Sequence, residues 1–243
     1  MNIFEEIDFQ NTSLGEISLR KRTEPRLDNI LIYEVKMNEE FLMSSLFVEA
    51  ELQLAHLGLA ELPEGIFNDG LDVIVGGLGL GYTAFAALEN QKISSLKVID
   101  VMAPVIDWHQ RELVPMGAEL MADDRCELVL GDFFALATSK SNGFGAANDD
   151  QKVHAVLLDI DHTPDFWLSP TNNSFYTQQG LRAMAEKIHT GGIFALWSDD
   201  LPDDRFTALL DSVFASSQAH VVTFPNAYTN SESSNTVYVA RKQ

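Results

Sequence analysis

The run LDVIVGGLGLGYTAFAAL (residues 71–88) passes from a short, mostly apolar segment through a glycine-rich turn into an alanine-rich segment. This order predicts the strand, turn and helix that open a βαβ unit. Glycines at such a turn let a ligand approach the backbone, and the helix that follows offers free N–H groups. The run therefore predicts a ligand site at the end of the first parallel strand.

The glycine spacing fits more than one class of ligand. Gly77-x-Gly79-x-Gly81 is the spacing of nucleoside-type methyl-donor sites, and Gly79-x-Gly81-x-x-Ala84 also satisfies a dinucleotide fingerprint. A tight strand-to-helix turn that binds nothing is a third interpretation. The spacing alone does not decide between these three interpretations.

Towards the C-terminus, short apolar runs alternate with helical segments, as in a parallel sheet covered on both faces. Helices are expected from Ala103 to about Met116, from Phe175 to Ile188 and from Pro202 to Phe214. The last two apolar runs have no helix between them and are expected to pair antiparallel. We therefore predict an α/β fold with a Rossmann-like, seven-stranded, mostly parallel sheet and an antiparallel C-terminal strand pair. Its strands are expected at 71–75, 96–100, 126–130, 153–160, 192–198, 219–225 and 235–242.

Towards the N-terminus, LGEISLRKR (14–22) and ILIYEVK (30–36) are strand-like and predict a short β-hairpin. Apolar residues then recur at helical spacing, which predicts an amphipathic helix from Glu40 to Leu62. We expect residues 1–39 to form a hairpin segment and residues 40–243 a Rossmann-like domain. The polar segment Ser139–Gln151 is expected to be a surface loop.

The chain is strongly acidic, with 16 Lys and Arg against 36 Asp and Glu and a formal charge of −20. This balance argues against nucleic acid and against an anionic membrane surface as partners, and it favours a cationic small molecule. The one cysteine, Cys126, allows neither an internal disulfide nor a thiolate zinc site. The acidic start MNIFEEIDFQ is unlike a signal peptide, so we expect a cytoplasmic protein.

Acidic residues follow three of the predicted strands, and ligands of open α/β sheets lie at these carboxyl ends. Asp100 could accept both hydroxyls of a ribose or cap the next helix, and Asp132 could receive an adenine amino group or cap its helix. Asp159 and Asp161 end the fourth strand, where burial and mutual repulsion would raise a carboxyl pKa towards general-base work. His162 could share a proton relay with them or be an ordinary loop histidine. The motifs of serine hydrolases, zinc peptidases and P-loop proteins are missing.

The order of elements and their signatures resemble the spermidine synthase family, the aminopropyltransferase branch of the class I methyltransferase superfamily. The resemblance spans about residues 14–241 and is most specific at Phe175-Tyr176-Thr177, Gly180-Leu181 and Gly191–Ser198. The N-terminal hairpin, followed by a helix that carries Glu49, is similar as well. The resemblance places the donor site at Gly77, Gly79, Gly81, Asp100 and Asp132 and the catalytic aspartate at Asp159. Asp161 and His162, which follow it closely, complete the predicted catalytic residues, and Glu49 and Tyr176 are predicted to contact the acceptor.

The resemblance implies that the donor is decarboxylated S-adenosylmethionine, that the acceptor is a polyamine-like cation, and that no metal takes part. It also implies a possible homodimer. Leu80 stands where the family loop carries an acid and Met102 replaces the second acid of the ribose motif. These departures favour an S-adenosylmethionine-dependent methyltransferase as the alternative. A non-catalytic nucleoside-binding protein and a nicotinamide dehydrogenase are further alternatives, although the antiparallel C-terminal pair counts against the dehydrogenase.

Overall fold

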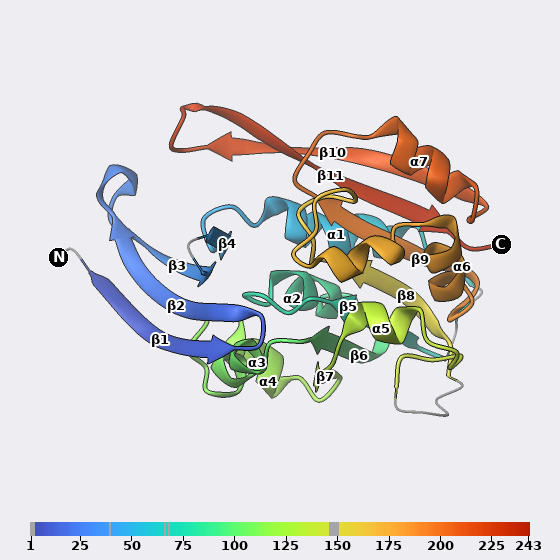
Figure 1. The fold of residues 1–243 in the computed structure, drawn as a ribbon, viewed down its shortest axis with the longest axis horizontal. Helices are drawn as coiled ribbons and strands as arrows, with labels where there is room; N and C mark the ends of the chain where they lie inside the picture. The colour runs from blue at the N-terminus through green and yellow to red at the C-terminus, as the bar shows by residue number, and fades with distance from the viewer. Residues whose placement is uncertain (1–2, 39, 66, 68, 146–150) are drawn as a thin grey trace.

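A seven-stranded sheet forms the centre of the computed structural model, which describes residues 3–38, 40–65, 67, 69–145 and 151–243 (Figure 1). The sheet order is β10-β11-β9-β8-β5-β6-β7. The five strands from β5 to β9 run parallel, and β10 and β11 pair antiparallel to each other and to β9. This confirms the predicted fold class. The strands are β5 (Leu71–Gly76), β6 (Ile93–Asp100), β7 (Cys126–Leu130), β8 (Val153–Leu158), β9 (Ile188–Ser198), β10 (Ser216–Asn226) and β11 (Ser231–Arg241).

Helices cover both faces of this sheet, as the apolar character of the parallel strands requires (Figure 1). Alternate residues of β5 point to opposite sides: Val73 and Val75 belong to the core beneath α1–α4, and Ile74 belongs to the core beneath α5–α7. The helices are α1 (Glu49–Ala60), α2 (Tyr82–Leu88), α3 (Ala103–Gln110), α4 (Gly117–Ala122), α5 (Phe133–Ala137), α6 (Gln178–Ala185) and α7 (Asp204–Asp211).

The predicted N-terminal hairpin is the central part of a four-stranded antiparallel sheet, in the order β1-β2-β3-β4. The hairpin itself corresponds to β2 and β3, which pair from Ile17 opposite Met37 to Glu24 opposite Ile30. Ile17, Leu19 and Val35 are buried and join the core of the large sheet. The small sheet therefore lies against the edge of the α/β domain where β5 and β6 end. The strands are β1 (Phe4–Thr12), β2 (Gly15–Glu24), β3 (Ile30–Met37) and β4 (Glu40–Ser44).

All four predicted helices are longer than those of the structure, where α6 is Gln178–Ala185 and α7 is Asp204–Asp211, and the other two differ most. Glu40–Ser44 is strand β4, paired with β3, so the helix predicted from Glu40 begins only at Glu49 and the small sheet extends past residue 39. The helix predicted from Ala103 ends at Gln110, because Glu112 adopts a left-handed φ of 56°. Tertiary pairing and local turn geometry overrode the helical spacing at these places. Of the predicted Ser139–Gln151 loop, residues 146–150 lie outside the described residues.

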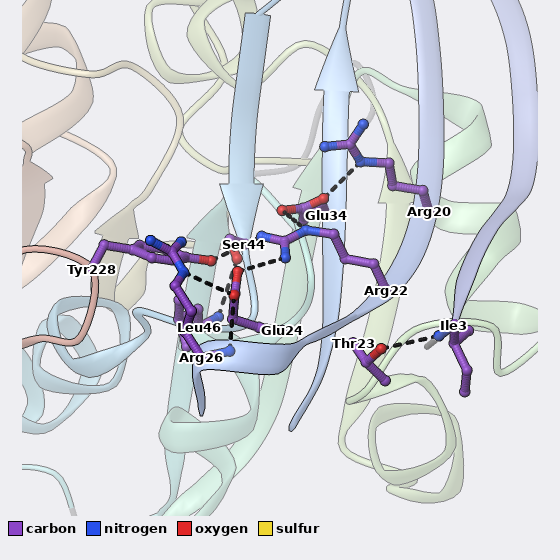
Figure 2. Close-up of polar contacts among 10 residues, drawn as sticks. All are labelled: Ile3, Arg20, Arg22, Thr23, Glu24, Arg26, Glu34, Ser44, Leu46 and Tyr228. Atoms are coloured by element: carbon purple, nitrogen blue, oxygen red, sulfur yellow. Dashed lines mark hydrogen bonds and ion pairs between the residues drawn. The ribbon is translucent and has the colours of Figure 1, made fainter. Parts of the chain in front are cut away.

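Charged residues connect the small sheet to the turn between β10 and β11 (Figure 2). Glu34, only 4% exposed, accepts hydrogen bonds from Arg20 Nε at 2.6 Å and Arg22 Nε at 3.0 Å. Arg22 also contacts Glu24 at 2.9 Å and donates to the Tyr228 hydroxyl at 2.8 Å. These contacts fix the C-terminal hairpin against the small sheet. None of the helices within the described ranges is long and apolar enough to cross a membrane.

Candidate active site

The glycine loop between β5 and α2 adopts backbone conformations that side chains disfavour. Gly77, Gly79 and Gly81 have φ values of 93°, 51° and 93°. A Cβ atom on Gly77 would lie 2.0 Å from the carbonyl oxygen of Asp159, and one on Gly79 would lie 2.6 Å from the Met43 side chain. The loop therefore needs glycine, both for its conformation and for its close approach to β8 and β4.

Asp100, at the end of β6, holds the glycine loop in place. Its carboxylate accepts hydrogen bonds from the backbone N–H of Leu78 at 2.9 Å and of Met102 at 2.7 Å. Burial raises the pKa of this carboxyl group, and the backbone hydrogen bonds oppose the rise. The backbone N–H of Gly79 acts on the carboxylate as well. A carboxylate has about four lone-pair sites, so these groups leave one for a ligand hydroxyl.

His109 on α3 contacts the glycine loop. The sequence did not predict a role for this residue. Its side chain is fully buried, and its Nε2 atom lies 3.0 Å from the carbonyl oxygen of Gly79. Burial lowers the pKa of His109 to about 4, so the ring is neutral at pH 7 and donates from Nε2 to this carbonyl. The histidine is a positioning residue for the loop. A histidine in an apolar helix gives no sequence signal of such a role.

Asp132 precedes α5 and caps it, accepting a hydrogen bond from the backbone N–H of Ala135 at 3.0 Å. This confirms the capping role that the sequence left open. The cap uses Oδ1, and Asp132 also lines a cavity next to the glycine loop. Its predicted contact to an adenine stays a prediction.

Asp159, at the end of β8, forms a carboxyl pair with Glu51 on α1. The Thr83 hydroxyl lies 2.7 Å from Asp159 Oδ2 and 3.3 Å from the Glu51 carbonyl oxygen. Burial raises the pKa of Asp159. Burial, together with the nearby charge of Asp159, raises the pKa of Glu51 as well. Sequence reasoning missed Glu51.

Two adjoining cavities meet at this carboxyl pair. The larger, of about 260 Å³, which we call the large chamber, is lined by Gly77, Asp100 and Asp132 among others. The smaller, of about 80 Å³, which we call the small chamber, is lined by Glu51, Tyr82 and Trp197 among others. Asp159 lines both and so faces a ligand in either. The residues common to the two chambers are Leu42, Met43, Gly79, Asp159, Ile160 and Leu168.

Asp161 does not line either chamber, although the sequence predicted a catalytic role for it. Its side chain is buried and accepts hydrogen bonds from the Leu168 N–H at 2.7 Å, from Asn172 Nδ2 at 2.9 Å and from the Tyr176 hydroxyl at 2.9 Å. Tyr176, a predicted substrate contact, is thus bound to Asp161. Together these groups fix the segment that follows β8.

The remaining predicted residues lie apart from each other. His162 lines the small chamber, and its ring stacks on Phe166 with a centroid distance of 5.1 Å. Glu49 lines neither chamber; its carboxylate accepts a hydrogen bond from the Val48 N–H at 3.0 Å at the start of α1. The acidic side chain that α1 brings to the site is therefore Glu51.

The charged side chains that line the two chambers are acidic. Four carboxyl groups line them, and none of the described residues that line them is lysine or arginine. No group of three or more His, Cys, Asp or Glu side chains in the described part of the chain is placed to hold a metal ion. The four carboxyl groups are those of Glu51, Asp100, Asp132 and Asp159.

The sheet order and the glycine loop place the chain among the Rossmann-like α/β proteins. More particularly, it has the fold of a spermidine synthase. A spermidine synthase in complex with the transition-state analogue AdoDATO matches with a TM-score of 0.71 and 15% identity, over 98% of this chain and 74% of that one. A spermidine synthase from Thermotoga maritima matches with a TM-score of 0.69 and 15% identity, over 98% and 72%. No family model and no curated protein matches the sequence.

Proposed function

We propose that this protein is a transferase that moves an aminopropyl group from decarboxylated S-adenosylmethionine to an amine, with Asp159 as the general base. The observation that carries the proposal is the position of Asp159 between the two chambers. A base at this position contacts an acceptor in the small chamber. The acceptor meets a donor in the large chamber at the same place. The spermidine synthase fold supports the same assignment.

The large chamber provides what a nucleoside donor needs. Asp100 lines the chamber and keeps a lone-pair site for a ribose hydroxyl beside the backbone N–H groups of Leu78, Met102 and Gly79. Asp132 uses Oδ1 as the cap of α5, which leaves Oδ2 for the adenine amino group. Apolar side chains of the small sheet, among them Ile17 and Val35, supply a wall for the adenosine.

The charge of the chambers favours the decarboxylated donor over S-adenosylmethionine itself. S-adenosylmethionine carries a carboxylate, which would lie among carboxyl groups with no lysine or arginine among the described residues that line the chambers. An unpaired anion in such a site is costly. The decarboxylated donor carries only positive charge, on its sulfonium and its ammonium, and is attracted instead.

In the proposed reaction Asp159 takes a proton from the acceptor ammonium, so that the nitrogen gains a lone pair. The nitrogen attacks the methylene carbon next to sulfur. A C–N bond forms, the C–S bond breaks, and the bonding electrons neutralise the sulfonium to give methylthioadenosine. The raised pKa of Asp159 makes it a better proton acceptor than an exposed carboxylate. Holding both reactants in adjoining chambers lowers the entropic cost of the step.

The first test is a calorimetric titration of the protein with S-adenosylmethionine and, separately, with its decarboxylated form. We expect the decarboxylated donor to bind at least about tenfold more tightly, since it avoids the unpaired carboxylate. Asp159→Asn should retain donor binding and lose at least about 100-fold in turnover, the usual contribution of a general base. Tighter binding of S-adenosylmethionine would contradict the proposal and favour methyl transfer.

A further inference from the structure

We propose that the acceptor is a short primary amine with a single ammonium group, and that Glu51 binds this ammonium beside Asp159. This inference rests on the proposed function and narrows its substrate class. It contradicts the simplest expectation from the sequence, a polyamine-like acceptor with several positive charges. The inference rests on the size, the charges and the polar groups of the small chamber.

The small chamber has space for only a few heavy atoms of the acceptor. An apolar protein cavity of about 150 Å³ holds one benzene molecule. The small chamber, of about 80 Å³, is about half as large and has space for about three or four carbon, nitrogen or oxygen atoms. An amine of the size of propylamine or ethanolamine fits within it, whereas longer amines extend out of the chamber.

The charges of the small chamber match one ammonium group. Glu51 and Asp159 are the acidic residues among those that line it, and they are close enough for the charge of Asp159 to act on Glu51. The Thr83 hydroxyl bonds to the Asp159 carboxylate and contacts the backbone carbonyl of Glu51. The other acids nearby, Asp161 and Asp199, do not line the chamber. Asp161 is bonded to Asn172 and Tyr176, and Asp199 accepts a hydrogen bond from Asn235 at 2.8 Å. A second ammonium would therefore lack a carboxylate in the chamber.

None of the other described residues that line the chamber offers a carboxylate to a second positive charge. Leu42, Leu80 and Leu168 supply apolar surface. Trp197 also lines the chamber, and its buried indole N–H has no hydrogen-bond partner in the described part of the chain. An uncharged far end, a methyl or a hydroxyl group, fits this wall, and a buried unpaired ammonium is costly.

The test compares four amines as acceptors with decarboxylated S-adenosylmethionine: propylamine, ethanolamine, 1,3-diaminopropane and 1,4-diaminobutane. The readout is the release of methylthioadenosine. We expect kcat/KM for the two monoamines to exceed that for the two diamines by at least about tenfold, because a second ammonium is left unpaired. Turnover that favours the diamines would overturn this inference alone. No release with any amine would overturn the proposed function together with it.

The variant Glu51→Gln tests the second part of the inference. Removing the charge of Glu51 while retaining its size should raise KM for the monoamine by about 10- to 100-fold, the usual effect of losing a charged hydrogen bond. KM for the donor should stay unchanged. Glu119→Gln, on the exposed surface of α4, is the matched control and should leave both constants unchanged. An unchanged KM for the amine in Glu51→Gln would show that Glu51 does not bind it.

Discussion

Glu51 and Asp159 are ordinary acidic residues whose chemistry changes because of where the fold places them. Both line the small chamber, and burial raises the pKa of both. Each therefore holds its proton to higher pH in the folded chain than in the unfolded chain. At neutral pH the unfolded chain loses these protons more readily, so burial of the two carboxyl groups lowers the stability of the fold. The same burial gives Asp159 the raised pKa that suits its proposed role as the base.

We predict that Glu51→Gln stabilises the protein, and more so at high pH. The folded state binds the Glu51 proton more tightly than the unfolded state, so ionisation with rising pH destabilises the wild-type fold. Glutamine has no proton to lose. The variant should gain about 1 kcal/mol at pH 8.5 and less at pH 5.5, as one pKa unit is worth about 1.4 kcal/mol.

Urea unfolding of both proteins at the two pH values measures this difference, with Glu119→Gln as the control. A gain of the same size at pH 5.5 and 8.5 would contradict the raised pKa of Glu51. A loss of stability at pH 8.5 would show that the ionised Glu51 has a stabilising partner.

Residues at strand ends could be predicted, and residues on helices could not. Asp100, Asp132 and Asp159 each follow a parallel strand, and all three line the large chamber. Glu49 and Glu51 lie two residues apart on α1, which turns their side chains about 200° from each other. The sequence does not show which of the two faces the sheet, and the resemblance pointed to Glu49.

At the scale of elements, the segment between β8 and α6 is arranged around Asp161. Asp161 bonds to the backbone of Leu168 and to the side chains of Asn172 and Tyr176. Leu168 in turn lines both chambers. The segment from Asp161 to Tyr176 therefore shapes the site through a buried polar network. The hydrogen bond between Asp161 and Tyr176 could not be predicted, because a pattern of acids and aromatics does not show which groups bond to each other. The predicted catalytic role of Asp161 and the predicted substrate contact of Tyr176 stay predictions.

We predict that Tyr176→Phe weakens the fold more than the reaction. It removes the hydrogen bond from the Tyr176 hydroxyl to Asp161 at 2.9 Å and should cost about 1–3 kcal/mol of unfolding free energy. KM for the amine should change less than about threefold, because Tyr176 does not line the small chamber. Thermal unfolding and amine kinetics test both expectations.

Tyr228→Phe is the matched control, since it removes a hydroxyl that bonds to Arg22 at the small sheet instead. It should leave the kinetics unchanged. A large rise of KM for the amine in Tyr176→Phe, with unchanged stability, would mean that Tyr176 contacts substrate after all.

At the scale of the whole molecule, the large sheet could be predicted because each parallel strand is short, apolar and followed by a helix. The small sheet was predicted only in part. β2 and β3 alternate clearly, whereas β4 has apolar residues at helical spacing and becomes a strand through its pairing with β3. Long-range pairing of this kind leaves a weak local signal. The pairing of β4 with β3 affects the site, because β4 supplies Leu42 and Met43 to both chambers.

The net charge of −20 belongs to the whole chain and predicts a dependence on salt. An acidic surface attracts a cationic acceptor, and salt screens this attraction over a Debye length of about 30 Å at 0.01 M and about 10 Å at 0.1 M. We predict that KM for the amine rises by up to about tenfold from 10 to 300 mM NaCl. The melting temperature should rise over the same range, because salt also screens the repulsion between the acidic residues.

Binding of methylthioadenosine provides the control, because it is uncharged and should bind equally at all salt concentrations. Steady-state kinetics and calorimetry across the NaCl series measure the two quantities on one protein. If KM for the amine stayed constant while the melting temperature rose, the acidic surface would serve solubility alone. The attraction of the acceptor would then come only from Glu51 and Asp159, whose burial in the small chamber shields them from salt.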